Sequence, residues 1–268
     1  MDKPRTLYKY ESISVQSLLN LKSQTIYFGP PANFNDPYDC AISARVREPT
    51  DSEINEFRKK YSEIDEIPEL TRNQLKTIPV DQLKKWLMRA TQQSANEIVE
   101  KNIEQRGVSC FSEVNNELLM WSHYADKYKG FCLEFDTNYE PFSKVRKVTY
   151  TDKMPTLSIT EALINNDYDQ FLELYCTKSG SWAYEKEWRC IHQVAGTSWI
   201  YESDALVSIY FGPEIDPRAL EIICLILKGQ NSTIKFWRGF RSSESFSVEF
   251  KPFEYTSNLE ARKLGIIT

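Results

Sequence analysis

One stretch of the sequence, Gly107 to Asp136, constrains the fold most, because it carries in turn the signals for a strand, a helix and a strand. Residues 108–111 favour a buried strand, and residues 131–135 predict a second one. Apolar residues recur at helical spacing between them, and Asn115 or Asn116 is expected to cap that helix. The polar and aromatic residues of this stretch either line a ligand cleft or belong to a core hairpin with a helical connection.

The chain as a whole predicts a single α+β domain spanning residues 1–268. With 268 residues, 41% of them hydrophobic, it is long and apolar enough to bury a substantial core. It has no apolar run long enough for a membrane span and no apolar signal segment at its start, so we expect a cytoplasmic protein without a membrane partner. The six cysteines form no C-x-x-C pair and are expected to stay reduced.

Charge and histidine content disfavour several classes of function. A net charge of −5 disfavours sequence-independent nucleic-acid binding, which needs a basic face, but is compatible with a local basic groove. His123 and His192 have no cysteine or carboxylate at zinc-ligand spacing, so no metal cofactor is expected. The motifs of phosphate-binding loops, dinucleotide-binding folds and serine hydrolases are also absent.

Residues 49–106 predict a helical insertion within this domain. Thr50 and Glu53 are spaced as a capping box at the start of one helix. A longer pattern runs from Val80 to Gln105, where apolar residues recur near the helical period among many charges. We expect this segment to form an inserted subdomain or lid with a solvated charged face.

A late strand is expected to carry an unusual group of charges. Alternation along residues 181–194 separates two sets of side chains, Trp188, Cys190 and His192 on one face and Glu185, Glu187, Arg189 and Ile191 on the other. Two carboxylates on one strand face repel each other unless a neighbouring cation compensates. The group is either a surface ion pair of little energetic value or a carboxylate that stabilises positive charge developing at a sugar carbon.

Four segments of the chain resemble a bacterial family catalogued as domain of unknown function 2971. They read LYKY, YFGPPANFNDPYD, CFSEVNNELLMWSHYADKYKGFCLEFD and SWAYEKEWR. The resemblance runs from Leu7 to about Gly212. The family label implies no reaction.

The order of these parts is also similar, more distantly, to that of the ADP-ribosyltransferase superfamily, which implies a split β-sheet core. The resemblance places the site on a first strand, a second strand, the helix after it and a late strand with an E-x-E motif. The implied residues are Tyr8, Lys9, Tyr10, Phe111, Ser112, Trp121, His123, Tyr124 and Arg189 for NAD, with Glu187 and Glu185 as catalytic carboxylates.

This second resemblance implies transfer of ADP-ribose from NAD to a macromolecule, either protein, RNA or DNA, without a metal. Glu187 would stabilise the oxocarbenium-like centre, and Glu185 would act on the acceptor. Aromatic side chains would stack on the nicotinamide, and Lys9 or Arg189 would meet the pyrophosphate. The implied setting is an intracellular toxin or anti-phage effector with an antitoxin or regulatory partner.

Two of these residues have a simpler interpretation. His123 lies off the apolar stripe of its helix and either faces the cleft or binds a backbone carbonyl, and we favour the carbonyl because no carboxylate partners it. Trp121 lies on the stripe, which favours core packing over a stacking role.

Two other functions remain open at the level of sequence. The loop NFNDPYD is interpreted first as a rigid turn, because Pro37 disfavours helix before it and Asn and Asp bond nearby backbone. A metal-dependent nuclease would instead use Asp36, Asp39 and Glu187. A non-enzymatic sensor or binding module would hold a ligand in the aromatic cleft.

Overall fold

The computed structural model describes residues 3–40, 45–158, 169–231 and 233–266. The chain divides into two compact units. The first is made of residues 1–29, 107–148 and 181–268, and the second of residues 30–106 and 149–180. Both helices and strands occur in each unit, which confirms the predicted α+β class.

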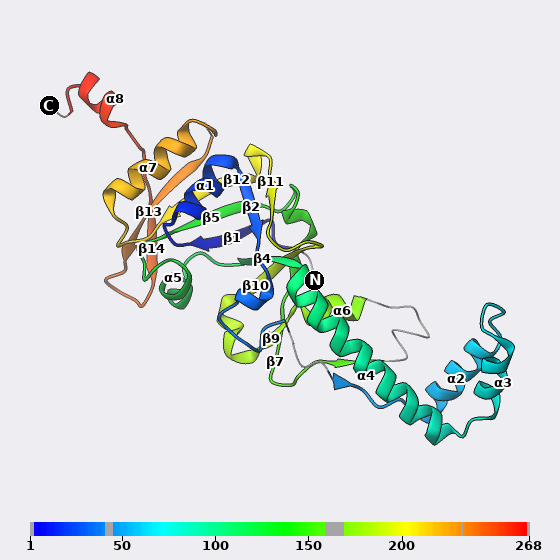
Figure 1. Ribbon diagram of the computed structural model, residues 1–268. Coiled ribbons are helices and arrows are strands. Elements are labelled where there is room, and N and C mark those ends of the chain that lie inside the picture. Colours follow the sequence, from blue (N-terminus) through cyan, green and yellow to red (C-terminus); the bar gives the residue numbers. More distant parts are fainter. Residues whose placement is uncertain (1–2, 41–44, 159–168, 232, 267–268) are drawn as a thin grey trace. The chain divides into compact units, whose positions relative to one another are not determined.

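The described part of the first unit is built on an eight-stranded mixed sheet. In spatial order its strands are β14 (Val248–Pro252), β13 (Lys235–Arg241), β12 (Leu206–Phe211), β5 (Phe131–Asp136), β1 (Thr6–Glu11), β4 (Gly107–Ser112), β10 (Glu187–His192) and β6 (Arg146–Lys147) (Figure 1). The pair β12–β13 is parallel, and the other neighbouring pairs are antiparallel. A separate antiparallel pair joins β2 (Thr25–Phe28) to β11 (Thr197–Ile200).

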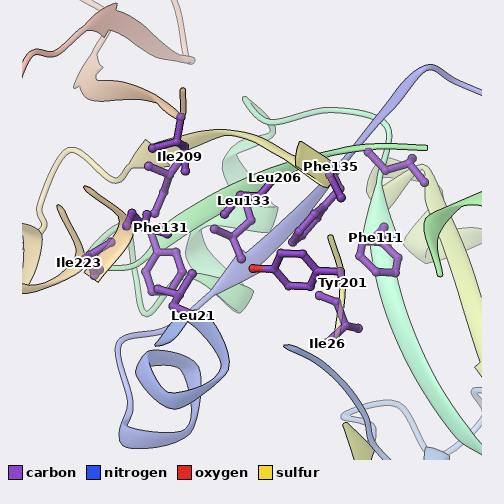
Figure 2. Close-up of a cluster of buried hydrophobic side chains, with 14 of the residues drawn as sticks. Leu21, Ile26, Phe111, Phe131, Leu133, Phe135, Tyr201, Leu206, Ile209 and Ile223 are labelled. Carbon is purple, nitrogen blue, oxygen red and sulfur yellow. The ribbon is translucent and has the colours of Figure 1, made fainter. Parts of the chain in front are cut away.

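One face of the large sheet carries the main hydrophobic core. Alternate residues of β5, namely Phe131, Leu133 and Phe135, point to this face because side chains along a strand alternate in direction (Figure 2). Leu21 of α1 (Val15–Ser23) and Ile223 of α7 (Pro217–Lys228) belong to the same core. The two helices contact each other and cover this side of the sheet.

The opposite face packs against α5 (Leu118–Tyr124), the helix expected between β4 and β5. Its N-cap is Glu117, whose carboxylate accepts a backbone N–H, so the expected asparagine cap is wrong. Left-handed backbone at Asp126, Lys127 and Tyr128 follows the helix and turns the chain back toward β5. The helix is therefore one turn shorter than its apolar stripe suggests.

The second unit holds the three helices of the expected insertion, α2 (Asp51–Ser62), α3 (Glu69–Thr77) and α4 (Val80–Gln105), followed later in the chain by α6 (Asp169–Leu174). The capping box of Thr50 and Glu53 is confirmed. Two parallel strand pairs complete the described part, β3 (Arg45–Val46) with β8 (Thr156–Leu157) and β7 (Thr149–Thr151) with β9 (Thr177–Ser179). The core of the unit consists of Val46, Ile54, Phe57, Leu83, Leu87 and Leu174.

Short 3-10 turns and one small helix complete the described elements. They are η1 (Pro31–Asn33), η2 (Phe142–Lys144), η4 (Gly180–Glu185), η5 (Ser203–Ala205) and α8 (Asn258–Lys263). None of the described helices is both long and apolar enough to cross a membrane. All six cysteines are free thiols.

The loop NFNDPYD forms the expected rigid turn. The Asp36 carboxylate accepts the backbone N–H of Tyr38 at 2.9 Å, and the Asp36 carbonyl accepts that of Asp39 at 3.1 Å. Asp39 is buried, and its carboxylate lies 3.3 Å from the ammonium of Lys178 on β9. The predicted turn is therefore confirmed.

Candidate functional site

A row of polar side chains crosses the face of the large sheet that packs against α5. Consecutive cross-strand partners on β12, β5, β1, β4 and β10 form it, in the order Ser208, Glu134, Tyr8, Ser112 and Glu187. Directly opposed residues of neighbouring strands share a face, so these five side chains leave the same side of the sheet. We call this set the polar row.

Glu187 and Arg189 form a buried ion pair at one end of the polar row. The guanidinium donates from Nε to Oε1 and from a terminal nitrogen to Oε2, both at 2.8 Å. Arg189 has no exposed surface, and Glu187 is 4% exposed. The predicted alternation of β10 is confirmed, but the alternative of a solvated surface ion pair is wrong because both sides of this strand are buried.

Glu185 does not share a strand face with Glu187, so that expectation is wrong. The strand β10 begins at Glu187, Glu185 ends the turn η4, and Lys186 between them has a left-handed φ of 46°. The Glu185 carboxylate is buried and accepts the phenolic hydrogen of Tyr124 at 2.6 Å. The turn thus aims Glu185 at helix α5.

Ser112 fixes this turn to the end of β4. Its hydroxyl donates to the Glu185 carbonyl at 2.6 Å and accepts the backbone N–H of Val114 at 3.2 Å. The backbone N–H of Glu113 donates to the Lys186 carbonyl at 3.1 Å. Ser112 is fully buried, and its hydroxyl joins the end of β4 to the turn η4 that carries Glu185.

Glu113 is a further carboxylate beside this group that the motifs did not single out. It accepts the indole N–H of Trp188 at 2.8 Å and the ammonium of Lys147 at 2.9 Å. Burial raises the pKa of the Glu113 carboxyl, but the two hydrogen bonds and the charge of Lys147 lower it by more, so the pKa lies below the ordinary value. Its position directly after Ser112 was the only sequence signal for it.

Glu134, which stands next to Ser208 in the polar row, was not predicted from the sequence either. One carboxylate oxygen accepts the phenol of Tyr8 at 3.3 Å, and the other accepts the phenol of Tyr210 at 2.9 Å. Burial, with the nearby Glu134 charge, raises the pKa of both tyrosines, so the phenols stay protonated and act as donors. The sequence signal was a single charged residue inside the apolar run FCLEF.

Several of the predicted NAD residues lie away from the polar row. Lys9 and Phe111 face the main core, with the ammonium 5.5 Å from the ring centroid. Tyr10 and Trp121 share the face of the polar row but pack edge to face at 5.2 Å and are buried. Trp121 has no exposed surface, which confirms its assignment to the core.

His123 lies on α5 next to the group that Tyr124 and Glu185 form. Its ring is exposed, and its centroid is 6.3 Å from that of Tyr124. Within the described residues, no three histidine, cysteine, aspartate or glutamate side chains are grouped as metal ligands would be.

Of the residues predicted for the site, the structure brings together six, namely Tyr8, Ser112, Tyr124, Glu185, Glu187 and Arg189.

Residues 120–190 match a family model described as protein of unknown function, DUF2971. No curated protein and no solved structure matches the chain. The matched segment runs from α5 through most of β10 and contains Tyr124, Glu185, Glu187 and Arg189. The buried pair of Glu187 and Arg189, at one end of the polar row, thus lies within the part of the chain that this family model covers.

Proposed function

We propose that this protein transfers ADP-ribose from NAD to a macromolecular acceptor, with Glu187 as the catalytic carboxylate. The observation that supports the proposal is the register of three strands. Tyr8 of β1 opposes Ser112 of β4, and Ser112 opposes Glu187 of β10. The resemblance to ADP-ribosyltransferases assigns to one site a first-strand residue among Tyr8, Lys9 and Tyr10, the second-strand residues Phe111 and Ser112, and Glu187. This register opposes one residue from each of these three groups, which are far apart in sequence.

The chemistry of the proposed reaction needs a fixed anion beside the sugar. When the bond from nicotinamide to ribose breaks, its electron pair leaves with nicotinamide, and positive charge develops at the anomeric carbon. An oriented carboxylate in a buried setting stabilises that charge more strongly than one in water. The two hydrogen bonds from Arg189 fix the plane of the Glu187 carboxylate before substrate binds.

Glu185 and Tyr124 are proposed to act on the acceptor. The acceptor must lose a proton as it attacks the anomeric carbon, and a carboxylate near the reaction centre can take it. Tyr124 holds Glu185 through a 2.6 Å hydrogen bond, and Ser112 holds the backbone of the same residue. The effector role, as toxin or anti-phage protein with a regulatory partner, rests on the resemblance alone.

Labelled NAD tests the proposal directly. The purified protein is incubated with adenylate-labelled NAD and cell lysate, the protein, RNA and DNA fractions are separated, and free nicotinamide is measured. We expect label in one fraction, and a loss of at least about 100-fold in Glu187→Gln, since this change removes charge but keeps volume. Glu244→Gln, at an exposed glutamate of the same unit, serves as the matched control.

The outcomes separate the proposal from its alternatives. If no fraction carries label and no nicotinamide is released, the transferase proposal is falsified. Magnesium-stimulated cleavage of nucleic acid without NAD turnover would identify a nuclease. Ligand binding that Glu187→Gln weakens, without turnover in the wild type, would identify a binding module. Thermal melts of each variant show whether lost activity reflects lost folding.

A further inference from the structure

Glu134, next to Ser208 in the polar row, is a carboxylate that the proposed reaction does not use. Glu134 on β5 is separated from Glu187 on β10 by β1 and β4. Three strand spacings of about 4.8 Å put their backbones roughly 14 Å apart. A group held at Glu134 therefore lies well away from the reaction centre proposed at Glu187.

The immediate partners of Glu134 are neutral. Both of its carboxylate oxygens accept tyrosine phenols, from Tyr8 and Tyr210, and the side chain is only partly buried. Within the described residues, no lysine, arginine or histidine pairs with it. A carboxylate accepts hydrogen bonds and attracts positive charge, so this site lacks the cation that would complete it.

Two tyrosine rings contact this carboxylate through their phenols, and a tryptophan ring stacks on one of them. Tyr8 meets Tyr210 edge to face at 5.9 Å, and Tyr210 stacks on Trp237 of β13 at 5.8 Å with the planes 10° apart. The buried indole N–H of Trp237 has no acceptor among the described residues. Aromatic faces attract cations through their quadrupole, and they favour cations that are flat or weakly hydrated over a bare metal ion.

We propose that Glu134, Tyr8, Tyr210 and Trp237 form a binding subsite for an organic cation such as a pyridinium or a guanidinium. The carboxylate supplies the charge, the phenols fix its orientation, and the rings supply flat apolar contact. The subsite lies wholly within the first unit. It shares Tyr8 with the proposed transferase site, but its test requires neither NAD nor turnover and so can fail separately from the transferase proposal.

Equilibrium binding tests this subsite with two pairs of probes, measured by calorimetry without NAD. N-methylnicotinamide cation is compared with neutral nicotinamide, and N-acetylarginine amide with its neutral isostere N-acetylcitrulline amide. We expect at least one charged probe to bind at least tenfold more tightly than its neutral partner. The responding pair shows whether the cation is a small pyridinium or an arginine side chain of a partner.

Three variants locate the binding. Glu134→Gln is expected to lower the affinity for the charged probe at least tenfold. Two control variants are expected to leave that affinity unchanged: Glu249→Gln, at an exposed position of β14, and Glu187→Gln. Equal binding of charged and neutral probes, or full binding by Glu134→Gln, overturns the proposal. The proposal is also overturned if neither of the two charged probes binds.

A second measurement covers the case in which Glu134→Gln does not fold. The indole N–H signal of Trp237, assigned by its loss in Trp237→Phe, is followed by NMR while the charged probe is added to wild-type protein. Movement of this signal with the charged probe and not with its neutral partner supports the subsite. A signal that stays in place while the probe binds elsewhere overturns it.

Discussion

Tyr124 donates its phenolic hydrogen to the buried carboxylate of Glu185 across 2.6 Å. This bond joins α5 to the turn before β10, two segments that are 61 residues apart in sequence. A charged acceptor makes the bond stronger than one between neutral groups. The helix and the turn η4 therefore depend on each other for position, and this dependence can be measured.

Tyr124→Phe is expected to destabilise the protein by about 1–3 kcal/mol, because it leaves a buried carboxylate without one of its donors. Urea unfolding measures the loss. Tyr128→Phe is the matched control, since it removes a phenol that donates to the neutral carbonyl of Leu118 at 3.0 Å. If the two variants lose the same free energy of unfolding, the hydrogen bond from Tyr124 to Glu185 is no stronger than one to a neutral carbonyl.

Arg189→Met is expected to destabilise the protein by about 3–5 kcal/mol, since it leaves Glu187 as a buried charge without its main counter-ion. The double variant Glu187→Gln/Arg189→Met should recover part of this loss, because neither charge then remains. A double-mutant cycle from urea unfolding gives the coupling energy. Strictly additive losses would contradict a tight pair.

Glu113 should make stability depend on pH in the acid range. Its pKa in the folded protein lies below the ordinary value of 4.5. Its stabilising effect is therefore complete above that value and disappears as pH falls through the lower, folded pKa. Glu113→Gln should cost about 1 kcal/mol or less at pH 7, and this difference from wild type should shrink toward pH 3. Chemical unfolding at both pH values measures it, and a difference that grows on acidification would contradict the assignment.

Cysteine alkylation should report on the charge of Glu187. Burial, and then the nearby Glu187 carboxylate, raises the pKa of the Cys110 thiol, so Cys110 should react slowly with iodoacetamide. Glu187→Gln should speed this reaction relative to Cys224, whose pKa of about 12 results mainly from its own burial. Mass spectrometry of the native protein over time gives both rates. Parallel acceleration of both cysteines would indicate general loosening of the fold instead.

Local patterns were sufficient to predict much of the fold. Residues close together in sequence account for several features, namely the strands at Gly107, Phe131 and Glu187, the Thr50 capping box and the NFNDPYD turn. The alternation of β10 likewise placed Glu187 and Arg189 on one face.

The site was less predictable because it depends on register between distant strands. Glu134 acquires its importance from Tyr210, which is 76 residues away, and no local pattern connects them. The position of Glu185 depends on left-handed backbone at Lys186, where lysine gives no sequence signal of the kind that glycine gives. These misses come from tertiary contacts that override local preference.

The second unit is made from two separate excursions of the chain, and this has a consequence for synthesis on the ribosome. Leu174 completes the core around Ile54 and Leu83, and β8 pairs with β3, so the first excursion waits for the second. Between residues 106 and 180 lie 74 further residues, which take roughly 4–15 s at about 5–20 residues per second. During that interval the apolar faces of α2 and α4 lack their final cover. A nascent chain paused in that interval exposes apolar surface that the finished unit buries, and exposed apolar surface favours aggregation and chaperone binding.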